Sequence, residues 1–165
     1  MQSDLVTFRR EAQPADRNRV RAIVSSTGVF SPVEIEVAIE LLDDWLAKGP
    51  RSEYQFIFAE SAGRTLGYAC YGPIPLTAAS YDLYWIAVEK ICQGQKIGQK
   101  LLAKTEELIL AAGGTHIYIE TSNRSQYVPT REFYIRRGYC QEALLKDFYS
   151  PGDDKVIYVK KVENT

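Results

Sequence analysis

The segment Gln93-Gly94-Gln95-Lys96-Ile97-Gly98 has the residue types of an anion-binding loop. It follows an apolar, β-rich run and opens a stretch that carries leucine and isoleucine at helical spacing. The first turn of a helix offers unpaired backbone N–H groups and the positive end of the helix dipole, while glycine lets the backbone approach phosphate oxygens closely. The sequence therefore predicts a pyrophosphate site on Gln93–Gln99, with Lys96 or Lys100 supplying positive charge.

The same residues have a second explanation, because a glycine at the start of an amphipathic helix is often plain turn chemistry. The dinucleotide fingerprint Gly-x-Gly-x-x-Gly and the Walker sequence Gly-Lys-Ser/Thr do not occur in the chain. The sequence therefore does not favour a nucleotide-binding protein of either class. The elements around the loop must decide between a phosphate site and a simple turn.

Hydrophobic periodicity predicts the elements that hold this loop. The predicted strands cover residues 5–8, 55–60, 65–71, 81–88, 116–120, 139–148 and 155–162. The predicted helices lie between Pro14 and Gly28, from Ser31 to Gly49, from Gly94 to Ala112 and from Thr130 to Arg136. Their order, β-α-α-β-β-β-α-β-α-β-β, is typical of an α/β fold with a mixed β-sheet flanked by helices, and we expect a single domain over residues 1–165.

The long predicted helix is flanked by the strand at Tyr84 and the strand at Ile119. A strand-helix-strand unit of this kind joins two parallel strands by a right-handed crossover. It also places the start of the helix at the carboxyl end of the strands, where ligands of open α/β sheets bind. The predicted phosphate loop lies at that end.

Composition limits the classes of partner. The 165 residues carry a net charge of −1 and 45% hydrophobic residues, so a basic nucleic-acid surface is not indicated. No stretch approaches the ~20 consecutive apolar residues of a membrane span, and Met1–Arg10 lacks the apolar centre of a signal peptide. We therefore expect a cytoplasmic protein with no nucleic-acid or membrane partner.

Cysteine and histidine do not indicate a metal site. Cys70, Cys92 and Cys140 are scattered without CxxC spacing, and His116 is the only histidine in the sequence. We expect no metal ion, and three reduced cysteines that serve as packing residues.

Two stretches of the sequence match a known family pattern. The first is Trp85-Ile-Ala-Val88, then Gln93-x-x-Lys96-x-Gly98, then Leu101-Leu102. The second is Thr130-Arg-Glu-Phe133-Tyr134-x-x-x-Gly138-Tyr139. Both resemble motifs of the GNAT superfamily of acyl-CoA N-acyltransferases, and the resemblance is strong from about Tyr81 to Tyr139.

Two residues depart from the family pattern. Lys96 stands where the family usually has the first glycine of the loop motif, so its side chain must point away from the pyrophosphate or over it. Tyr127 stands where the family often has asparagine, so the contact usually made by that amide is not carried over.

The resemblance implies that acetyl-CoA is the co-substrate and assigns residues to its binding. The pantetheine amides would pair with the backbone of Ile86 and Val88, and the N–H near Ala87 or Val88 would polarise the acetyl carbonyl. Thr130 and Tyr134 of the second motif would also contact acetyl-CoA, in addition to the loop Gln93–Gln99.

The resemblance also implies the proton-transfer groups. Tyr134 is the expected general acid or thiol hydrogen-bond donor, because a phenol with pKa ~10 can serve a departing thiolate of pKa ~8.5 when the two groups touch. Two carboxylates are candidates for the general base. Asp82 matches the strand position where histone-acetylating members carry a glutamate base, and Glu120 lies at the carboxyl end of the neighbouring predicted strand.

The predicted function is transfer of the acetyl group of acetyl-CoA to a primary amine of a small molecule, peptide or protein, by direct attack in a ternary complex. The alternative is a catalytically idle acyl-CoA-binding module with a sensor or regulatory role. In the family, acceptor choice depends on the loop between the first two helices, here Thr27–Val33, and on the last hairpin, here Phe148–Lys155. Neither segment carries the acidic cluster that a polyamine would require, which favours a small or peptide-like acceptor. The resemblance further implies a homodimer through the C-terminal strands.

Overall fold

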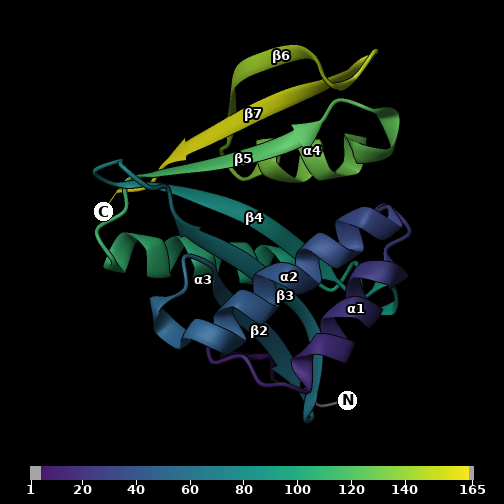
Figure 1. Cartoon of the computed structure of the whole chain (residues 1–165), viewed down its shortest axis with the longest axis vertical. Coiled ribbons are helices and arrows are strands. Elements are labelled where there is room, and N and C mark those ends of the chain that lie inside the picture. The colour runs from purple at the N-terminus through teal and green to yellow at the C-terminus, as the bar shows by residue number, and fades with distance from the viewer. Residues whose placement is uncertain (1–4, 164–165) are drawn as a thin grey trace. The chain divides into compact units, whose positions relative to one another are not determined.

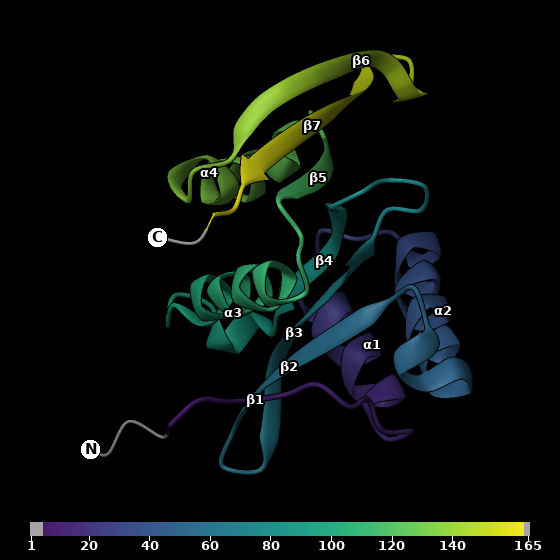
Figure 2. The same cartoon turned by 90° about the vertical axis from the view of Figure 1, so that its left-hand side faces the viewer.

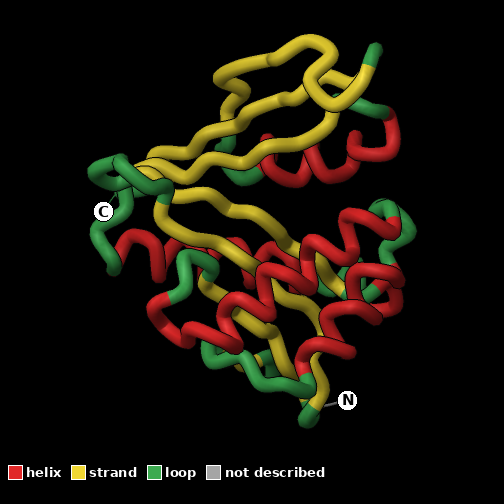
Figure 3. The backbone as a smooth tube through the Cα atoms, viewed as in Figure 1, coloured by secondary structure: helices red, strands yellow, loops and turns green. Residues whose placement is uncertain are grey.

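The computed structural model describes residues 5–163 (Figure 1). The strands are β1 Thr7–Arg9, β2 Gln55–Ser61, β3 Arg64–Pro73, β4 Ser80–Val88, β5 His116–Ser122, β6 Cys140–Ser150 and β7 Asp153–Lys161. The α-helices are α1 Asp16–Ser26, α2 Pro32–Lys48, α3 Ile97–Ala111 and α4 Val128–Arg136. Short 3-10 helices are η1 Gly49–Arg51, η2 Lys90–Cys92 and η3 Ser125–Tyr127. The predicted order of strands and α-helices is confirmed (Figure 3).

Hydrogen bonds join the strands of residues 5–163 into a seven-stranded mixed sheet with the order β1-β2-β3-β4-β5-β7-β6. β4 and β5 are parallel, with Ser80–Asp82 beside His116–Tyr118. The pairs β1-β2, β2-β3, β5-β7 and β6-β7 are antiparallel. The predicted α/β fold is therefore confirmed, and the strands that precede and follow the long helix in the chain are parallel, as expected.

The chain divides into two compact units, and the division falls inside β4 between Leu83 and Tyr84. The first unit comprises the described residues up to Gly72 together with Tyr84–Leu108. The second comprises Pro73–Leu83 and the described residues from Ile109 onward. The carboxyl half of β4 and the predicted phosphate loop therefore belong to the first unit, and α4 with the β5-β7-β6 strands belongs to the second.

In the first unit, α1 and α2 lie on one face of the β2-β3 hairpin and α3 lies on the other (Figure 2). The apolar spacing of both N-terminal helices directs one side of each helix inward. The core under α1 and α2 is formed by helix residues and by hairpin residues: Val20, Ile23, Val24, Ala38, Ile39, Leu42, Phe56, Phe58, Tyr68 and Cys70. This packing fixes β3, the strand beside β4.

Local sequence signals set the ends of these elements. The Ser31 hydroxyl accepts from the Glu34 N–H, and the Glu34 carboxylate accepts from the Ser31 N–H, which forms a complete capping box at the start of α2. In the β2-β3 turn, Ala62 and Gly63 both have positive φ, as a tight type I′ hairpin turn requires. Gly67 of β3 allows close approach to β4, because a Cβ atom there would lie 2.7 Å from the Ala87 carbonyl oxygen.

In the second unit, β5 has an inner face that packs against α4 and an outer face that does not. The inner face carries three buried β5 residues with their β7 partners: Ile117 with Lys160, Ile119 with Tyr158 and Thr121 with Val156. Lys160 Nζ lies 5.6 Å from the ring centroid of Tyr139, just after α4. Burial raises the pKa of Tyr158, and the positive charge of Arg131 on α4 lowers that pKa in part. Because side chains alternate along a strand, Tyr118 and Glu120 lie on the outer face.

Within residues 5–163, no helix combines the length and the apolar character that crossing a lipid bilayer demands.

Candidate functional site

The carboxyl end of β4 leads directly into the predicted phosphate loop. Ala87 is buried, while Ile86 and Val88 are half-buried. After Val88 the backbone is held to β3, because the Glu89 N–H donates to the Leu66 carbonyl at 2.9 Å. The residues that the family resemblance assigns to pantetheine pairing therefore stand on a fixed strand end.

The loop after β4 is exposed, and its backbone is not helical. Helix α3 begins at Ile97 rather than at Gly94, so the predicted start was wrong by three residues. Gly94 has φ of 82° and Lys96 has φ of 63°, and neither value is compatible with a right-handed helix. The first bond of α3 runs from the Lys100 N–H to the Lys96 carbonyl at 3.0 Å. The N–H groups of Ile97 and Gly98 precede it, in the first turn of the helix, where the helix itself offers no carbonyl partner.

The side chain of Gln93 anchors this loop. Gln93 Nε2 donates to the Val88 carbonyl oxygen at 3.2 Å, which ties the start of the loop to the end of β4. A Cβ atom added at Gly94 would meet nothing within 4 Å, so the loop faces open space there. The side chains of Gln95, Lys96 and Gln99 are exposed. The loop has the fixed backbone, first-turn N–H groups and exposed side chains that suit an anion.

Lys96 adopts a left-handed conformation at the position where the family usually has glycine. Left-handed φ costs a non-glycine residue about 1–2 kcal/mol, and glycine avoids this cost because it has no Cβ. The backbone shape that the family builds with glycine is thus kept here. The departure at Lys96 changes the side chain and the local strain but not the path of the loop.

A half-buried carboxylate next to the loop does not stand out in the sequence. Glu89 lies between two arginines: the Arg19 guanidinium donates to both carboxylate oxygens, at 3.1 and 2.6 Å, and Arg64 donates to one. The Arg19 hydrogen bond lowers the pKa of Glu89, and Arg64 lowers it further. Arg19 also donates to the Thr65 carbonyl. The cluster joins α1, β3 and the start of the loop, and its members are too far apart in the sequence for spacing to reveal it.

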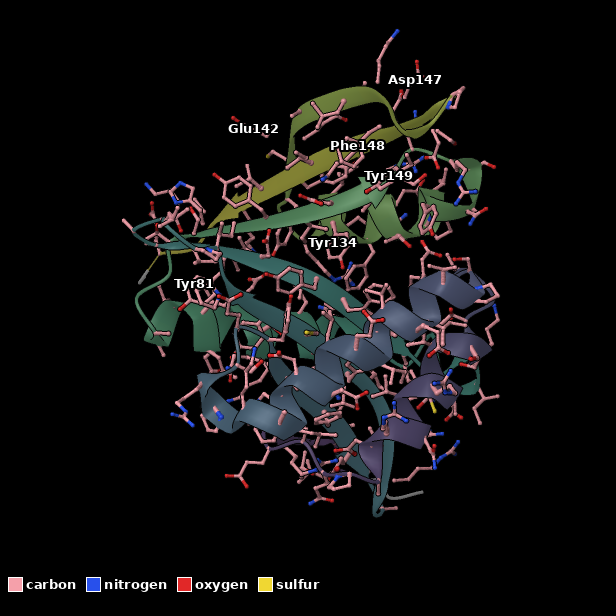
Figure 4. The ribbon with its side chains drawn as sticks, in the orientation of Figure 1. Tyr81, Tyr134, Glu142, Asp147, Phe148 and Tyr149 are labelled. Carbon is pink, nitrogen blue, oxygen red and sulfur yellow. The ribbon has the colours of Figure 1, made fainter. Side chains whose placement is uncertain are left out.

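Tyr134 lies on α4 in the second unit (Figure 4). Its side chain is buried, and its ring packs edge-on against Phe133 at 5.2 Å and Tyr139 at 5.6 Å between centroids. Burial raises the pKa of the Tyr134 phenol, so the hydroxyl is protonated at neutral pH. A neutral phenol at this position can donate a hydrogen bond. Thr130, one turn earlier on α4, is half-buried.

A polar network fixes the connection from β5 to α4. The Ser122 hydroxyl donates to the buried Asp153 carboxylate, which also pairs with Arg124 at 3.2 Å. Arg131 of α4 donates to the Ser122 carbonyl at 2.9 Å and to the Arg124 carbonyl at 3.0 Å. These bonds attach the start of α4, and with it Tyr134, to the end of β5. The Arg131 guanidinium is thus occupied by two backbone carbonyls.

Glu120 is at the carboxyl end of β5, as predicted, and it is ion-paired. Lys155 Nζ of β7 lies 2.6 Å from Glu120 Oε2. The Glu120 side chain is 49% exposed, whereas the Lys155 side chain is only 12% exposed. Sequence analysis did not detect Lys155, because the pairing depends on the register of β5 against β7.

Asp82 and Glu120 lie on the same face of the sheet. Asp82 is beside Tyr118 in the parallel register, and Tyr118 and Glu120 are two residues apart on the outer face of β5. Tyr134 belongs to α4, on the inner face. The two candidate bases therefore share a face, and the candidate acid lies on the other.

One further prediction is corrected by the structure. Cys140 is exposed at the start of β6, so it is not a core residue, whereas Cys70 and Cys92 are buried as expected. Among the aromatic residues of the second unit, Phe148 and Tyr149 (Figure 4) are 53% and 48% exposed, whereas Tyr139 is buried. Among residues 5–163, no cluster of three or more His, Cys, Asp or Glu side chains is arranged to hold a metal ion.

Comparison with known proteins places these features in a family. The family model described as an acetyltransferase (GNAT) domain matches residues 52–141, which include the β4-loop-α3 motif and α4. An uncharacterised N-acetyltransferase of Methanocaldococcus jannaschii is 32% identical over 109 residues, which cover 66% of this chain and 67% of that protein.

Solved structures share the same architecture. A structure from Desulfovibrio desulfuricans, assigned to the acetyltransferases of the GNAT family, is 46% identical, covers 96% of this chain and 100% of its own, and superposes with a TM-score of 0.92. The PaiA N-acetyltransferase of Thermoplasma acidophilum, solved in complex with coenzyme A, is 19% identical with a TM-score of 0.73 over 96% of this chain and 99% of its own, and it shows the common fold. This chain therefore belongs to the GNAT acetyltransferase family and is an acyltransferase enzyme.

Proposed function

We propose that the protein transfers the acetyl group of acetyl-CoA to a primary amine by direct attack within a ternary complex. The observation that carries the proposal is the loop Gln93–Lys96, where Gly94 and Lys96 have left-handed conformations just before the first-turn N–H groups of Ile97 and Gly98. The side chains of Gln95 and Lys96 are exposed there. Such a helix start binds anions, and a diphosphate is one of them. Acetyl-CoA would supply the acetyl group as an activated thioester.

Each unit contributes groups suited to one part of this task. The first-turn N–H groups of α3 would hold the pyrophosphate, with positive charge from Lys96. The register between β4 and β5 covers only Ser80–Asp82 on the β4 side, so the backbone of Ile86–Val88 is outside that register and is proposed to pair with the pantetheine amides. Thr130 of α4 is proposed as a further contact.

Tyr134 is proposed to donate a hydrogen bond to the departing thiolate. Full proton transfer from a phenol to a thiolate with pKa ~8.5 is uphill, and burial raises the pKa of Tyr134 further. A hydrogen bond to the thiolate stabilises the charge as the C–S bond breaks, without requiring that transfer to be complete. The proton that the attacking ammonium must lose is proposed to pass to a carboxylate on the outer face, Asp82 or Glu120.

The acceptor is proposed to be a small or peptide-like primary amine. The hairpin acids Asp153 and Asp154 are engaged within the protein, since Asp153 pairs with Ser122 and Arg124 and Asp154 bonds Asn123. They therefore do not form a free acidic cluster of the kind that would bind a polyamine. Three unpaired cysteine thiols support the proposal that the protein works in the reducing cytoplasm.

We also propose a homodimer through β6. This strand is last in the order of the sheet, and four of its large apolar side chains are exposed: Leu144, Leu145, Phe148 and Tyr149. An edge strand with exposed apolar residues is a template for pairing with another chain. A twofold axis through Leu144 would set Glu142 opposite Lys146 of the second copy, which makes an antiparallel pair electrostatically complementary.

A catalytically idle acyl-CoA-binding module is the second candidate. It is favoured by the ion pair between Glu120 and Lys155, which occupies one candidate base. Turnover of acetyl-CoA distinguishes the two functions, because an idle module would bind the thioester without releasing thiol.

The assignment of the phosphate loop can be tested by a substitution that adds a negative charge and keeps the shape of the side chain. Gln95→Glu puts a carboxylate on the exposed loop, and it should weaken binding of coenzyme A about two- to fivefold at low salt, since a charge at a helix start is worth about 0.3–1 kcal/mol. Gln13→Glu, an exposed glutamine of the same unit, is the matched control. Calorimetry that shows equal affinity for both variants would contradict the assignment of the loop.

A further inference from the structure

The ammonium group of Lys155 is held by one residue from each of two neighbouring strands. Lys155 Nζ of β7 lies 2.6 Å from Glu120 Oε2 of β5 and 4.2 Å from the ring centroid of Phe148 of β6. A carboxylate together with the face of an aromatic ring is the arrangement that recognises ammonium ions. All three residues belong to the second unit.

The register of the strands brings Glu120 and Lys155 together. Glu120 is opposite Ile157, and Lys155 is two residues before Ile157 on the same face of β7. The two side chains are therefore diagonal neighbours on the outer face, within reach of a long side chain. This is the face that also carries Asp82, the other candidate base.

A bulge in β6 aims Phe148 at this position. Between the pairs Leu145-Lys155 and Ser150-Asp153, four residues of β6 face only Asp154 of β7. Bulges of this kind redirect side chains. The bulge is fixed by polar contacts, because the Asp147 N–H donates to Asp154 Oδ1 and the Gly152 N–H donates to Asp147 Oδ1, both at 2.8 Å.

The two residues around the Lys155 ammonium are exposed to solvent, whereas the Lys155 side chain is largely covered. The Glu120 and Phe148 side chains are 49% and 53% exposed, whereas the Lys155 side chain is 12% exposed. The Phe148 ring makes an edge-on contact with the Tyr149 ring, with 5.1 Å between the two centroids (Figure 4). Lysine has a flexible four-carbon stem, so its ammonium can leave while Glu120 and Phe148 stay in place.

We infer that Glu120 and Phe148 form the binding site for the ammonium group of the acceptor, and that Lys155 occupies this site in the free protein. The inference rests on the proposed acetyl transfer and names the part of the acceptor that is recognised. An acceptor would displace Lys155 Nζ and present its own primary ammonium to the Glu120 carboxylate. The carboxylate that binds the ammonium is then also placed to take its proton.

Occupation of the proposed ammonium site by Lys155 affects which amines can bind as acceptors. An acceptor must compete with an ammonium that is tethered to the site, so its apparent affinity is reduced by the fraction of molecules in which Lys155 is in place. Weakly binding amines are excluded by this competition. Removal of the Lys155 charge should therefore tighten binding of simple amines rather than weaken it, which a purely structural ion pair does not predict.

The test uses n-butylammonium as the probe and n-butanol as its neutral counterpart, titrated by NMR against the full-length protein. Lys155→Met should bind n-butylammonium at least about fivefold more tightly than the wild type, because about 1 kcal/mol of internal competition is removed. Lys161→Met is the matched control, since Lys161 of the same strand pairs with Glu163 at 2.7 Å and its side chain is 63% exposed. It should bind like the wild type, and n-butanol should bind none of them.

The double variant Glu120→Gln/Lys155→Met should lose the gain. The inference is overturned if Lys155→Met binds no more tightly than the wild type, or if the gain persists after Glu120→Gln. Lys155→Gln gives a second test should the methionine variant fold poorly. Calorimetry with coenzyme A on the same proteins distinguishes failure of the proposed acetyl transfer from failure of the proposed ammonium site. A protein that does not bind coenzyme A would contradict the acetyl transfer, and the titration with n-butylammonium would still test the ammonium site.

Discussion

Glu120 and Tyr134 lie on opposite faces of the β5-β7 strand pair. Glu120 is on the outer face, paired with Lys155, and Tyr134 belongs to α4, which covers the inner face. The group proposed to accept a proton and the group proposed to donate a hydrogen bond are therefore on different faces of this strand pair.

The role of Tyr134 predicts a selective kinetic defect. Tyr134→Phe removes only the hydroxyl and keeps the ring contacts with Phe133 and Tyr139. We expect kcat to fall at least about tenfold, equivalent to about 1.4 kcal/mol, while the affinity for coenzyme A is kept. Because burial raises the pKa of Tyr134, the phenol stays protonated and no limb of the kcat profile below about pH 10 should belong to it.

A matched tyrosine serves as control for that experiment. Tyr54→Phe removes the hydroxyl of a half-buried tyrosine in the first unit and keeps its ring contact with Tyr84. It should leave kcat within about twofold of the wild type, since Tyr54 lies outside the proposed sites. Equal rates for Tyr134→Phe and wild type would rule out the hydroxyl as a participant.

The left-handed conformation of Lys96 predicts opposite effects on stability and binding. Lys96→Gly and Lys96→Ala both remove the charge, but only glycine relieves the backbone strain at φ of 63°. Allowing for the greater entropy of unfolded glycine, Lys96→Gly should be more stable than Lys96→Ala by about 0.5–1 kcal/mol in urea unfolding. Both variants should weaken coenzyme A binding to a similar extent. A glycine variant no more stable than the alanine variant would show that the loop is not strained there.

The ion pairs of Glu89 with Arg19 and Arg64 should stabilise the folded protein in a pH-dependent way. Its pKa is lowered, first by the Arg19 hydrogen bond, so its contribution is present above the unfolded pKa of about 4.3 and is lost as pH falls through the lower folded pKa. Glu89→Gln should therefore lower the urea midpoint at neutral pH, and the difference from wild type should shrink in acid. Glu36→Gln, which removes an exposed carboxylate paired with Arg21, should show a smaller effect. A Glu89→Gln deficit that is constant with pH would contradict the ion-pair explanation.

The exposed apolar residues of β6 predict a dimer in solution. Light scattering should give twice the mass of the chain, and Leu145→Asp should convert the protein to a monomer because it places a charge at the proposed interface. Val37→Asp is the control, since Val37 on α2 is 39% exposed, close to the 41% of Leu145. A wild-type protein that is monomeric at all concentrations would exclude this dimer.

Much of the fold was predictable because local signals agreed with the tertiary structure. The capping box of Ser31 and Glu34 and the tight turn at Ala62-Gly63 are encoded by neighbouring residues. The start of α3 was predicted too early, because apolar spacing locates the buried face of a helix but carries no information about the φ of Gly94 and Lys96.

The chemistry of the site was predictable only in part. The loop and Tyr134 belong to short continuous motifs, and the structure places them on the predicted elements. The pairing of Glu120 with Lys155 depends on strand register, and the approach of Phe148 depends on a bulge fixed by Asp147 and Asp154. The cluster of Glu89 with Arg19 and Arg64 likewise joins distant segments, so none of these contacts follows from spacing along the chain.

The most direct test of the proposed acetyl transfer is release of free thiol from acetyl-CoA, measured against a panel of small primary amines and short peptides. The proposal predicts thiol release that depends on the amine and yields the N-acetylated product by mass spectrometry. Binding of coenzyme A without turnover on any amine would favour the idle module, and absence of both binding and turnover would contradict the proposed function.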